Sequence, residues 1–167
     1  MVHDPALLDA LEREGAAPLK CEVWRHMFNG ADPARPNTRG ARWNPSGVAA
    51  VYLSLQRETA LAEAEFSMAA QPVRPQPKSR ELHRIAVTLQ AVGDLRDVAT
   101  LGSMGVGATE LGRWPPTECQ RVGGAAAWLQ WDGLLVPSAR ADGLNLVVFP
   151  DHMNPDALLE VIDSIIL

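Results

Sequence analysis

Segments with a strand pattern and segments with a helix pattern follow one another along this chain without regular alternation. Apolar runs and alternating apolar and polar residues predict strands at 20–28, 48–54, 82–89, 133–137 and 144–149. A doubly wound sheet needs strands and helices to alternate, so this order favours an α+β fold. Because the chain has 167 residues and no internal repeat, we expect one domain over residues 1–167.

Two helices are expected in the first half of the chain, with loops around them. Asp4 can cap a helix that ends at Gly15, and the strong helix formers of 58–70 predict a second helix. Glycine, proline and asparagine crowd the segment 29–47, which predicts an ordered but irregular loop. The prolines of 71–80 predict a loop or a mobile excursion.

Two further helices are expected in the second half. Thr117 and Gln120 have the spacing of a capping box, which predicts that a helix starts there. Asn154 and Pro155 are expected to open a last amphipathic helix that reaches the C-terminus. Residues 93–114 contain several glycines, and their hydrophobic pattern is weak, with no clear period.

The charge balance and the cysteines limit what the chain can bind. With 15 basic and 20 acidic side chains, the net charge of −5 argues against direct nucleic-acid binding, which needs a positive face. No secretion signal and no apolar run near the roughly 20 residues of a membrane span are visible, so we expect a cytoplasmic protein without membrane contact. Cys21 and Cys119 lie in no cluster with histidine, so no metal site is expected.

Arginines gather around the turn-rich segment. Arg42 and Trp43 lie in GARWNPSG, directly before the strand expected at 48–54, and a guanidinium group can grip phosphate through two parallel hydrogen bonds. Arg25 lies next to His26 inside a strand, where a charge is uncommon unless it is paired or faces a cleft. The plainer alternatives are a surface arginine stacked on Trp43 and an edge-strand Arg25 that faces water.

Two glutamates of the helix expected at 58–70 compete for one role. Glu63 and Glu65 point about 200° apart on a helix, so at most one of them faces a shared site. Helical periodicity favours Glu65 as the partly buried carboxylate, and two solvated glutamates are the alternative. Ser138 and Gln120 are also candidates, although each has an ordinary structural explanation.

Taken together, these residues resemble the RES domain, a toxin family named for its Arg, Glu and Ser. The matching segments cover nearly the whole chain in order: WRH (24–26), GARWNPSGVAAVYLS (40–54), TALAE (59–63), ECQRVGGAAAWL (118–129) and GLLVPSAR (133–140).

The resemblance implies a fold and a function. The fold is expected to be like that of ADP-ribosyltransferases, with small split mixed or antiparallel sheets flanked by helices around a central NAD cleft. The expected activity is that of a toxin that cleaves the nicotinamide–ribose bond of NAD and passes ADP-ribose to a protein, water or phosphate. NAD is then the substrate, no metal is needed, and the expected partner is an antitoxin with an Xre-type helix-turn-helix.

The resemblance also assigns residues. It favours Glu63 over Glu65, and it leaves His26 as a departure, because relatives often have tyrosine there. The residues expected to act in catalysis are Glu63, Arg42 and Ser138. The residues expected to bind NAD are Arg25, His26, Arg42, Trp43, Tyr52, Gln120 and Ser138.

These residue types suit the expected chemistry. Cleavage of the nicotinamide–ribose bond passes through an oxocarbenium-like centre, which a carboxylate such as Glu63 can stabilise. Arg25 and Arg42 would clamp the pyrophosphate, and Tyr52 and Trp43 would offer flat apolar surface to a ring.

Ser138 and Gln120 would orient ribose or amide groups by hydrogen bonds. Two other readings stay open at this point. One is a catalytically inactive module that senses NAD or binds an antitoxin, and the other is a toxin that acts on nucleic acid, which the acidic balance disfavours.

Overall fold

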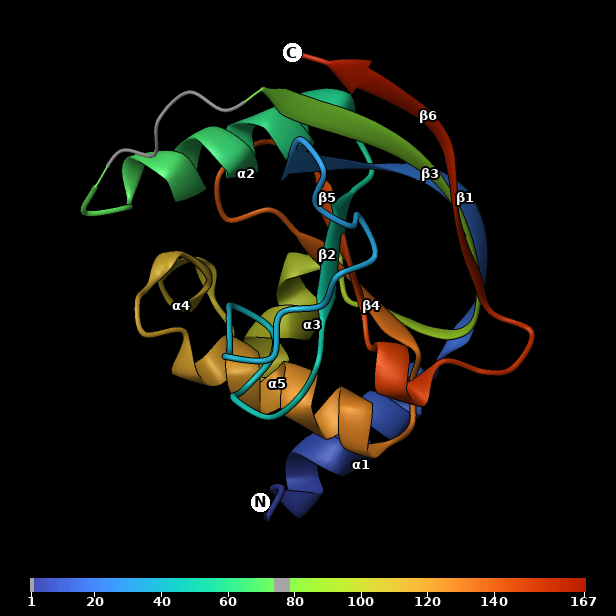
Figure 1. The fold of residues 1–167 in the computed structure, drawn as a ribbon. Helices are drawn as coiled ribbons and strands as arrows, with labels where there is room; N and C mark the ends of the chain where they lie inside the picture. Colours follow the sequence, from blue (N-terminus) through green and yellow to red (C-terminus); the bar gives the residue numbers. More distant parts are fainter. Residues whose placement is uncertain (1, 74–78) are drawn as a thin grey trace.

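The strands form two small antiparallel groups that join at their edges (Figure 1). The computed structural model describes residues 2–73 and 79–167. The strands are β1 (Ala17–Phe28), β2 (Val51–Ser54), β3 (Arg80–Asp94), β4 (Gly133–Pro137), β5 (Leu144–Val148) and β6 (Leu158–Ile166). The helices are α1 (Pro5–Glu14), α2 (Arg57–Ala69), α3 (Val98–Ser103), α4 (Ala108–Gly112) and α5 (Thr117–Trp128), with a 3-10 turn at Pro150–His152.

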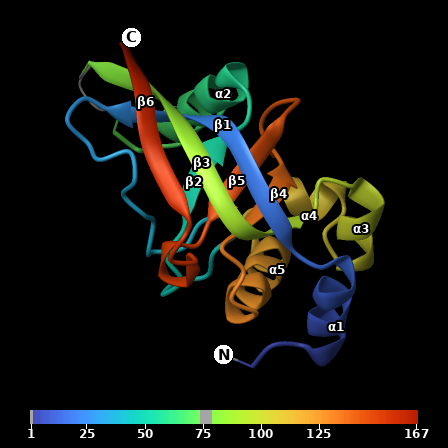
Figure 2. The same ribbon diagram turned by 90° about the vertical axis from the view of Figure 1, so that its right-hand side faces the viewer.

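Strand pairing explains how the two groups meet. In the first group β1 and β6 both pair antiparallel with β3, and in the second β2 and β4 both pair antiparallel with β5. The groups join where Trp24 pairs with Ser54 and where the end of β3 runs parallel to β4. Figure 2 shows β1, β3 and β6 crossing in front of the second group. The sheet is therefore mixed and split into two groups. Because the pairings run from β1 through β2, β5, β4 and β3 back to β1, its strands close into a small barrel, with β6 added along β3.

Apolar side chains cover both faces of the second strand group. Val23, Ile85 and Leu89 of the first group pack against Leu53 and Leu146 in the core between the two groups. A second core lies on the opposite face of β2, β4 and β5, where α1, α3 and α5 contribute the buried Leu11, Leu101 and Val122. The strands β2, β4 and β5 thereby become a rigid platform for the loops that leave them.

A close helix–loop contact holds the irregular segment 29–47 against this platform. Gly123 of α5 lies so near the main chain of Trp43 that an added Cβ would overlap the Trp43 carbonyl oxygen. Trp43 is buried in the core on the α5 side. The missing side chain of Gly123 therefore lets the loop approach the helix, which offsets the cost of glycine inside a helix.

Most of the elements expected from the sequence are confirmed, and so is the α+β class. The first helix is capped by Asp4 and ends at Gly15 as expected. The segment expected as a strand at 48–54 pairs as β2 only from Val51, and the expected strand at 82–89 extends to 80–94. Of the loop expected at 71–80, residues 74–78 lie outside the described residues.

Two expectations about the second half were wrong, namely the capping box and the last helix. The helix expected from Thr117 is confirmed as α5, but Thr117 and Gln120 form no capping box, because Pro116 is the N-cap and no side chain caps α5. Two short helices, α3 and α4, lie in 93–114, where the sequence showed only a weak pattern. The last segment is the strand β6 instead of a helix, since its β-branched residues pair with the free edge of β3. In the part of the chain that the structure describes, no helix is long and apolar enough to cross a membrane.

Candidate functional site

The carboxylate of Glu63 is fixed at the ends of β4 and β5. Its Oε1 atom accepts a 2.6 Å hydrogen bond from the Ser138 hydroxyl and a 2.9 Å bond from the Asn145 side-chain amide. The Ser54 hydroxyl donates in turn to Asn145 Oδ1 at 2.8 Å, which orients that amide. No described residue donates to Oε2 of Glu63, so the second oxygen remains available to a ligand.

Ser138 links this carboxylate to the loop after β4. While its hydroxyl donates to Glu63, its oxygen accepts the main-chain N–H groups of Arg140 at 3.1 Å and of Ala141 at 3.2 Å. Ser138 is buried, with 8% of its surface exposed. A hydroxyl held by two donors has one direction left for its own proton, and that direction points to Glu63.

Glu65 lies in different surroundings. Its side chain is 65% exposed and forms a 2.8 Å ion pair with Arg80. Periodicity favoured Glu65 as the partly buried carboxylate, and the structure reverses that order, since Glu63 is the one that contacts β4 and β5. The face of α2 that meets the sheet is set by the packing of the helix on β1 and β2, which the helical period alone does not reveal.

Arg42 is presented by a turn that the Tyr52 hydroxyl organises. This hydroxyl accepts the Trp43 main-chain N–H at 2.8 Å and donates to Asn44 Oδ1 at 2.7 Å. Asn44 is fully buried, and its amide donates to the carbonyls of Asn37 and Val48. Burial raises the pKa of Tyr52 far above its usual value, so the hydroxyl keeps its proton. The turn before β2 is thus held by buried polar groups that are all satisfied.

The Arg42 guanidinium contacts the C-terminal end of α4. Its Nη1 donates to the carbonyls of Leu111 and Arg113. From α5, Gln120 donates through Nε2 to the Ala41 carbonyl at 2.9 Å. Gln120 therefore supports the main chain beside Arg42, and Arg42 keeps further N–H groups for an anion, because a guanidinium has five donors.

Arg25 lies apart from this cluster. Cross-strand partners share a sheet face, and Trp24 pairs with Ser54 on the Glu63 side, so Arg25 points to the opposite face. Its guanidinium donates to the carbonyls of Pro33 and Arg35. Burial lowers the pKa of Arg25. The structure does not bring Arg25 together with Arg42 and Glu63, and its contacts tie the loop 29–47 to β1.

Among the described residues, neither His26 nor Trp43 donates a hydrogen bond to the Glu63 carboxylate. His26 meets Phe28 edge to face, with ring centroids 6.1 Å apart, and burial lowers its pKa. Trp43 is only 1% exposed and belongs to the core on the α5 side. Its ring therefore offers no surface to a ligand, in contrast to the flat platform expected from the sequence.

Two polar residues of the cluster were not expected from the sequence. Asn145 contacts Glu63, and Asn44 supports the Arg42 turn. A signal for Asn145 was present, because it is a polar residue in the otherwise apolar strand LNLVV. Asn44 is buried because the turn folds onto α5, and no local sequence pattern predicts that contact.

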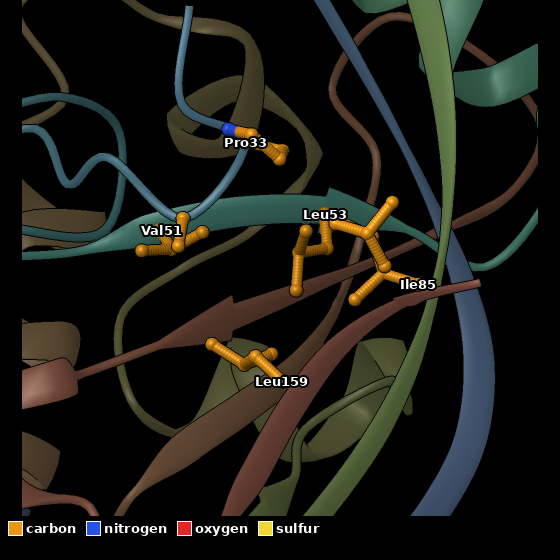
Figure 3. Close-up of a pocket in the computed structure, with 7 residues that line it drawn as sticks. Pro33, Val51, Leu53, Ile85 and Leu159 are labelled. Carbon is orange, nitrogen blue, oxygen red and sulfur yellow. The ribbon is translucent and has the colours of Figure 1, made fainter. Parts of the chain in front are cut away.

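Two cavities of the structure lie away from the Glu63 cluster. A small apolar one lies between β2, β3 and β6, lined by Pro33, Leu53, Ile85 and Leu159 among others (Figure 3). A more open one lies between the end of α1 and the start of α3. Neither is lined by Glu63, Arg42 or Ser138. Within residues 2–73 and 79–167, no group of at least three His, Cys, Asp or Glu could hold a metal ion.

Comparison with known proteins identifies relatives of this chain. The RES domain model matches residues 22–165. The NAD(+) phosphorylase MbcT of Mycobacterium tuberculosis and the protein of that name in Mycobacterium bovis are each 30% identical over 123 residues. Those matches cover 71% of this chain and 66% of the relatives, so the matched part spans just under two thirds of their length.

A solved structure extends the similarity to the fold. The crystal structure of the Mycobacterium tuberculosis MbcT–MbcA toxin–antitoxin complex contains a chain that matches with a TM-score of 0.85 and 27% sequence identity. The match covers 98% of this chain and 93% of that one. The mixed, split sheet described above is therefore the sheet of an MbcT-like fold.

Proposed function

The chain belongs to the RES family, and on that basis we propose that it is a toxin that consumes NAD by cleaving the bond between nicotinamide and ribose. The relatives' name, NAD(+) phosphorylase, favours inorganic phosphate as the acceptor of ADP-ribose. A protein or water as acceptor would be a different outcome of the same test.

One observation carries the proposal. Glu63 is held through one oxygen by Ser138 and Asn145, while its other oxygen accepts no bond from a described residue. A carboxylate fixed in this way is preorganised to accept a hydroxyl of the nicotinamide-bearing ribose and to face a developing positive charge. Electrostatic preorganisation of this kind is usually the largest single contribution to the stabilisation of developing charge, and NAD cleavage passes through an oxocarbenium-like centre.

The reaction is balanced without a further co-reactant. The bond between the ribose anomeric carbon and the pyridinium nitrogen breaks, and its electron pair stays with the nitrogen, so nicotinamide leaves as a neutral molecule. A phosphate oxygen then forms the new bond to the anomeric carbon. Since nicotinamide is a good leaving group, correct positioning supplies most of what the step needs.

The roles of the other residues follow from their contacts. Arg42 would bind the pyrophosphate with the N–H groups that its two carbonyl partners leave free. Ser138 would hold Glu63, whereas Tyr52 and Gln120 would keep the Arg42 turn in place. In this proposal Arg25 supports the loop 29–47 from the opposite face and does not touch NAD.

The fold likeness and the partner are also part of the proposal. We expect the split sheet to hold NAD as an ADP-ribosyltransferase-like fold does, with the Glu63 carboxylate facing the nicotinamide-bearing ribose. The solved relative is a toxin–antitoxin complex, which supports an antitoxin as the partner of this chain. An Xre-type helix-turn-helix in that antitoxin would supply the DNA binding that the acidic net charge of −5 disfavours here.

Nicotinamide release tests the proposal directly. The protein is incubated with NAD in buffers with and without inorganic phosphate, and the products are separated by chromatography. Release that depends on phosphate, together with ADP-ribose phosphorylated at the anomeric carbon, is expected. Free ADP-ribose would identify water as the acceptor. A labelled protein band, seen when labelled NAD is incubated with the protein and cell extract, would identify a protein as the acceptor. No release under any of these conditions would overturn the proposal.

A further inference from the structure

A second arginine, Arg140, lies beside the Glu63 cluster and has no part in the roles above. It follows Ser138 by two positions in the loop after β4, and its main-chain N–H donates to the Ser138 hydroxyl at 3.1 Å. Its guanidinium carbon lies 3.5 Å from the centre of the Phe66 ring on α2. Arg140 is therefore tied to the cluster through its main chain and through its side chain.

The charges of Arg42 and Glu63, the two residues assigned to NAD, both act on Arg140. Partial burial lowers the pKa of Arg140, the positive charge of Arg42 lowers it further, and the negative charge of Glu63 raises it. Arg140 thus lies within electrostatic reach of both side chains. Among the residues that the structure describes, neither Arg140 nor Arg42 takes part in an ion pair.

Among the described residues, no carboxylate lies within ion-pair distance of either guanidinium group, although the charge of Glu63 reaches Arg140. Two such groups whose charges act on each other indicate a place for an anion. Like charges repel, so bringing them together costs free energy that an anion bound between them would offset. The stacking on Phe66 uses the face of the Arg140 guanidinium and leaves its in-plane N–H groups free. These are the donors that bind phosphate through parallel hydrogen bonds.

We propose that Arg140 is a second phosphoryl-binding residue of the NAD site, acting together with Arg42 next to the Glu63 carboxylate. This inference rests on the proposed function and adds the residue that would hold phosphoryl oxygens next to the reacting sugar. The group bound there is either the pyrophosphate of the dinucleotide or the free phosphate acceptor. Both present the same oxygens to the guanidinium, and the kinetics separate them.

The test compares three variants with the parent protein. Arg140→Gln removes the charge, Arg140→Lys keeps the charge without the planar fork, and Arg96→Gln is the control. Arg96 is 54% exposed and pairs with Asp94 on the surface, and no contact links it to the Glu63 cluster. Thermal unfolding of each variant shows whether the fold is retained before any rate is compared.

Initial rates of nicotinamide release are measured against NAD at saturating phosphate and against phosphate at saturating NAD. Loss of a charged hydrogen bond should raise one KM by about 10- to 100-fold in Arg140→Gln, with partial recovery in Arg140→Lys and no change in Arg96→Gln. A raised KM for phosphate assigns the acceptor, and a raised KM for NAD assigns the pyrophosphate.

The inference fails separately from the proposed function. An active parent whose two KM values are unchanged in Arg140→Gln overturns the role of Arg140 and leaves NAD cleavage standing. An inactive parent counts against NAD cleavage instead. In that case calorimetric titration of the parent and of Arg140→Gln with ADP-ribose and with inorganic phosphate tests the inference. Arg140→Gln should bind one of these two ligands more weakly by a similar factor. Equal affinities of parent and variant for both ligands would overturn the inference.

Discussion

The Ser138 hydroxyl donates a 2.6 Å hydrogen bond to Glu63 Oε1, although 75 residues separate the two in sequence. Because two main-chain N–H groups of the next loop hold the serine oxygen, its proton has a defined direction. The bond therefore fixes the rotamer of Glu63, whose other carboxylate oxygen accepts no hydrogen bond from a described residue. Ser138 would then act on the reaction through Glu63.

The Ser138→Ala variant should separate positioning from binding. Without the hydroxyl, Glu63 keeps only the bond from Asn145 and loses its fixed orientation. We expect kcat for nicotinamide release to fall by about 10- to 100-fold, with little change in the KM for NAD. The control is Ser164→Ala, which loses a hydrogen bond to His83 on the β3–β6 edge and should keep the parent's kcat. A change in KM alone would argue against a positioning role.

Glu63 and Glu65 offer a matched pair on one helix. Glu63→Gln keeps the size of the side chain but removes the charge that we propose faces the reacting sugar, so kcat should fall by at least about 100-fold. Glu65→Gln loses an exposed ion pair with Arg80 and should stay within about twofold of the parent. Nicotinamide release gives both rates, and equal losses in the two variants would contradict the assignment of the carboxylate.

Local signals in the sequence were sufficient for part of this structure. The Asp4 cap and the glycine at the end of α1 are set by neighbouring residues, and the apolar runs of β2, β4 and β5 need burial on both faces. The candidate residues Glu63, Ser138 and Arg42 also came from the sequence, through the family segments. Their contacts depend on the meeting of strand ends, which no single segment encodes.

The remaining features depend on tertiary contacts. Residues 158–166 have apolar side chains at a spacing that fits a helix as well as a strand, and the free edge of β3 decides in favour of β6. The burial of Trp43 depends on Gly123, which lies 80 positions later in the chain. The packing of α2 on the sheet likewise makes Glu63 the partly buried carboxylate, whereas helical periodicity favours Glu65.

Tyr52→Phe tests whether the hydroxyl or the ring of this residue matters. The variant keeps the ring but leaves the Trp43 N–H and Asn44 Oδ1 without their partner. We expect the free energy of unfolding to fall by about 1–3 kcal/mol and the KM for NAD to rise as the Arg42 turn loosens. Chemical denaturation and initial rates measure the two effects. Parent-like values in both would mean that only the ring is needed.

His26 should make the stability depend on pH. Burial lowers its pKa below 6.5, Arg80 and His83 lower it further, and Glu65 opposes them. Below pH 6.5 the unfolded chain therefore takes up a proton that the folded chain resists, so stability falls with falling pH until the lower folded pKa is passed. The loss is at most about 1.4 kcal/mol per pH unit.

Urea denaturation of the parent and of His26→Gln at about pH 7.5 and about pH 5.5 measures this contribution. The other titrating groups are common to both proteins, so the difference between the two pH-dependent losses isolates His26. The parent should lose more stability than the variant. Equal losses would show that His26 has the same pKa in the folded and unfolded chains.

Gly123→Ala sets helix propensity against a tertiary contact. In an isolated helix alanine is favoured over glycine by about 0.8–1 kcal/mol, but at this position its Cβ would overlap the Trp43 carbonyl oxygen. Because that oxygen belongs to main chain that buried polar groups fix, neither side can move cheaply. We expect a net loss of about 2–3 kcal/mol in the free energy of unfolding and weaker binding of NAD by Arg42.

Gly102→Ala is the matched control, since Gly102 lies in α3 with nothing within 4 Å of its Cβ position. Its free energy of unfolding should rise by about 0.5–1 kcal/mol. Denaturant midpoints of the two variants should move in opposite directions. A stabilised Gly123→Ala protein would mean that the loop 29–47 is free to leave α5, and the Arg42 turn would then lack the support on which its role depends.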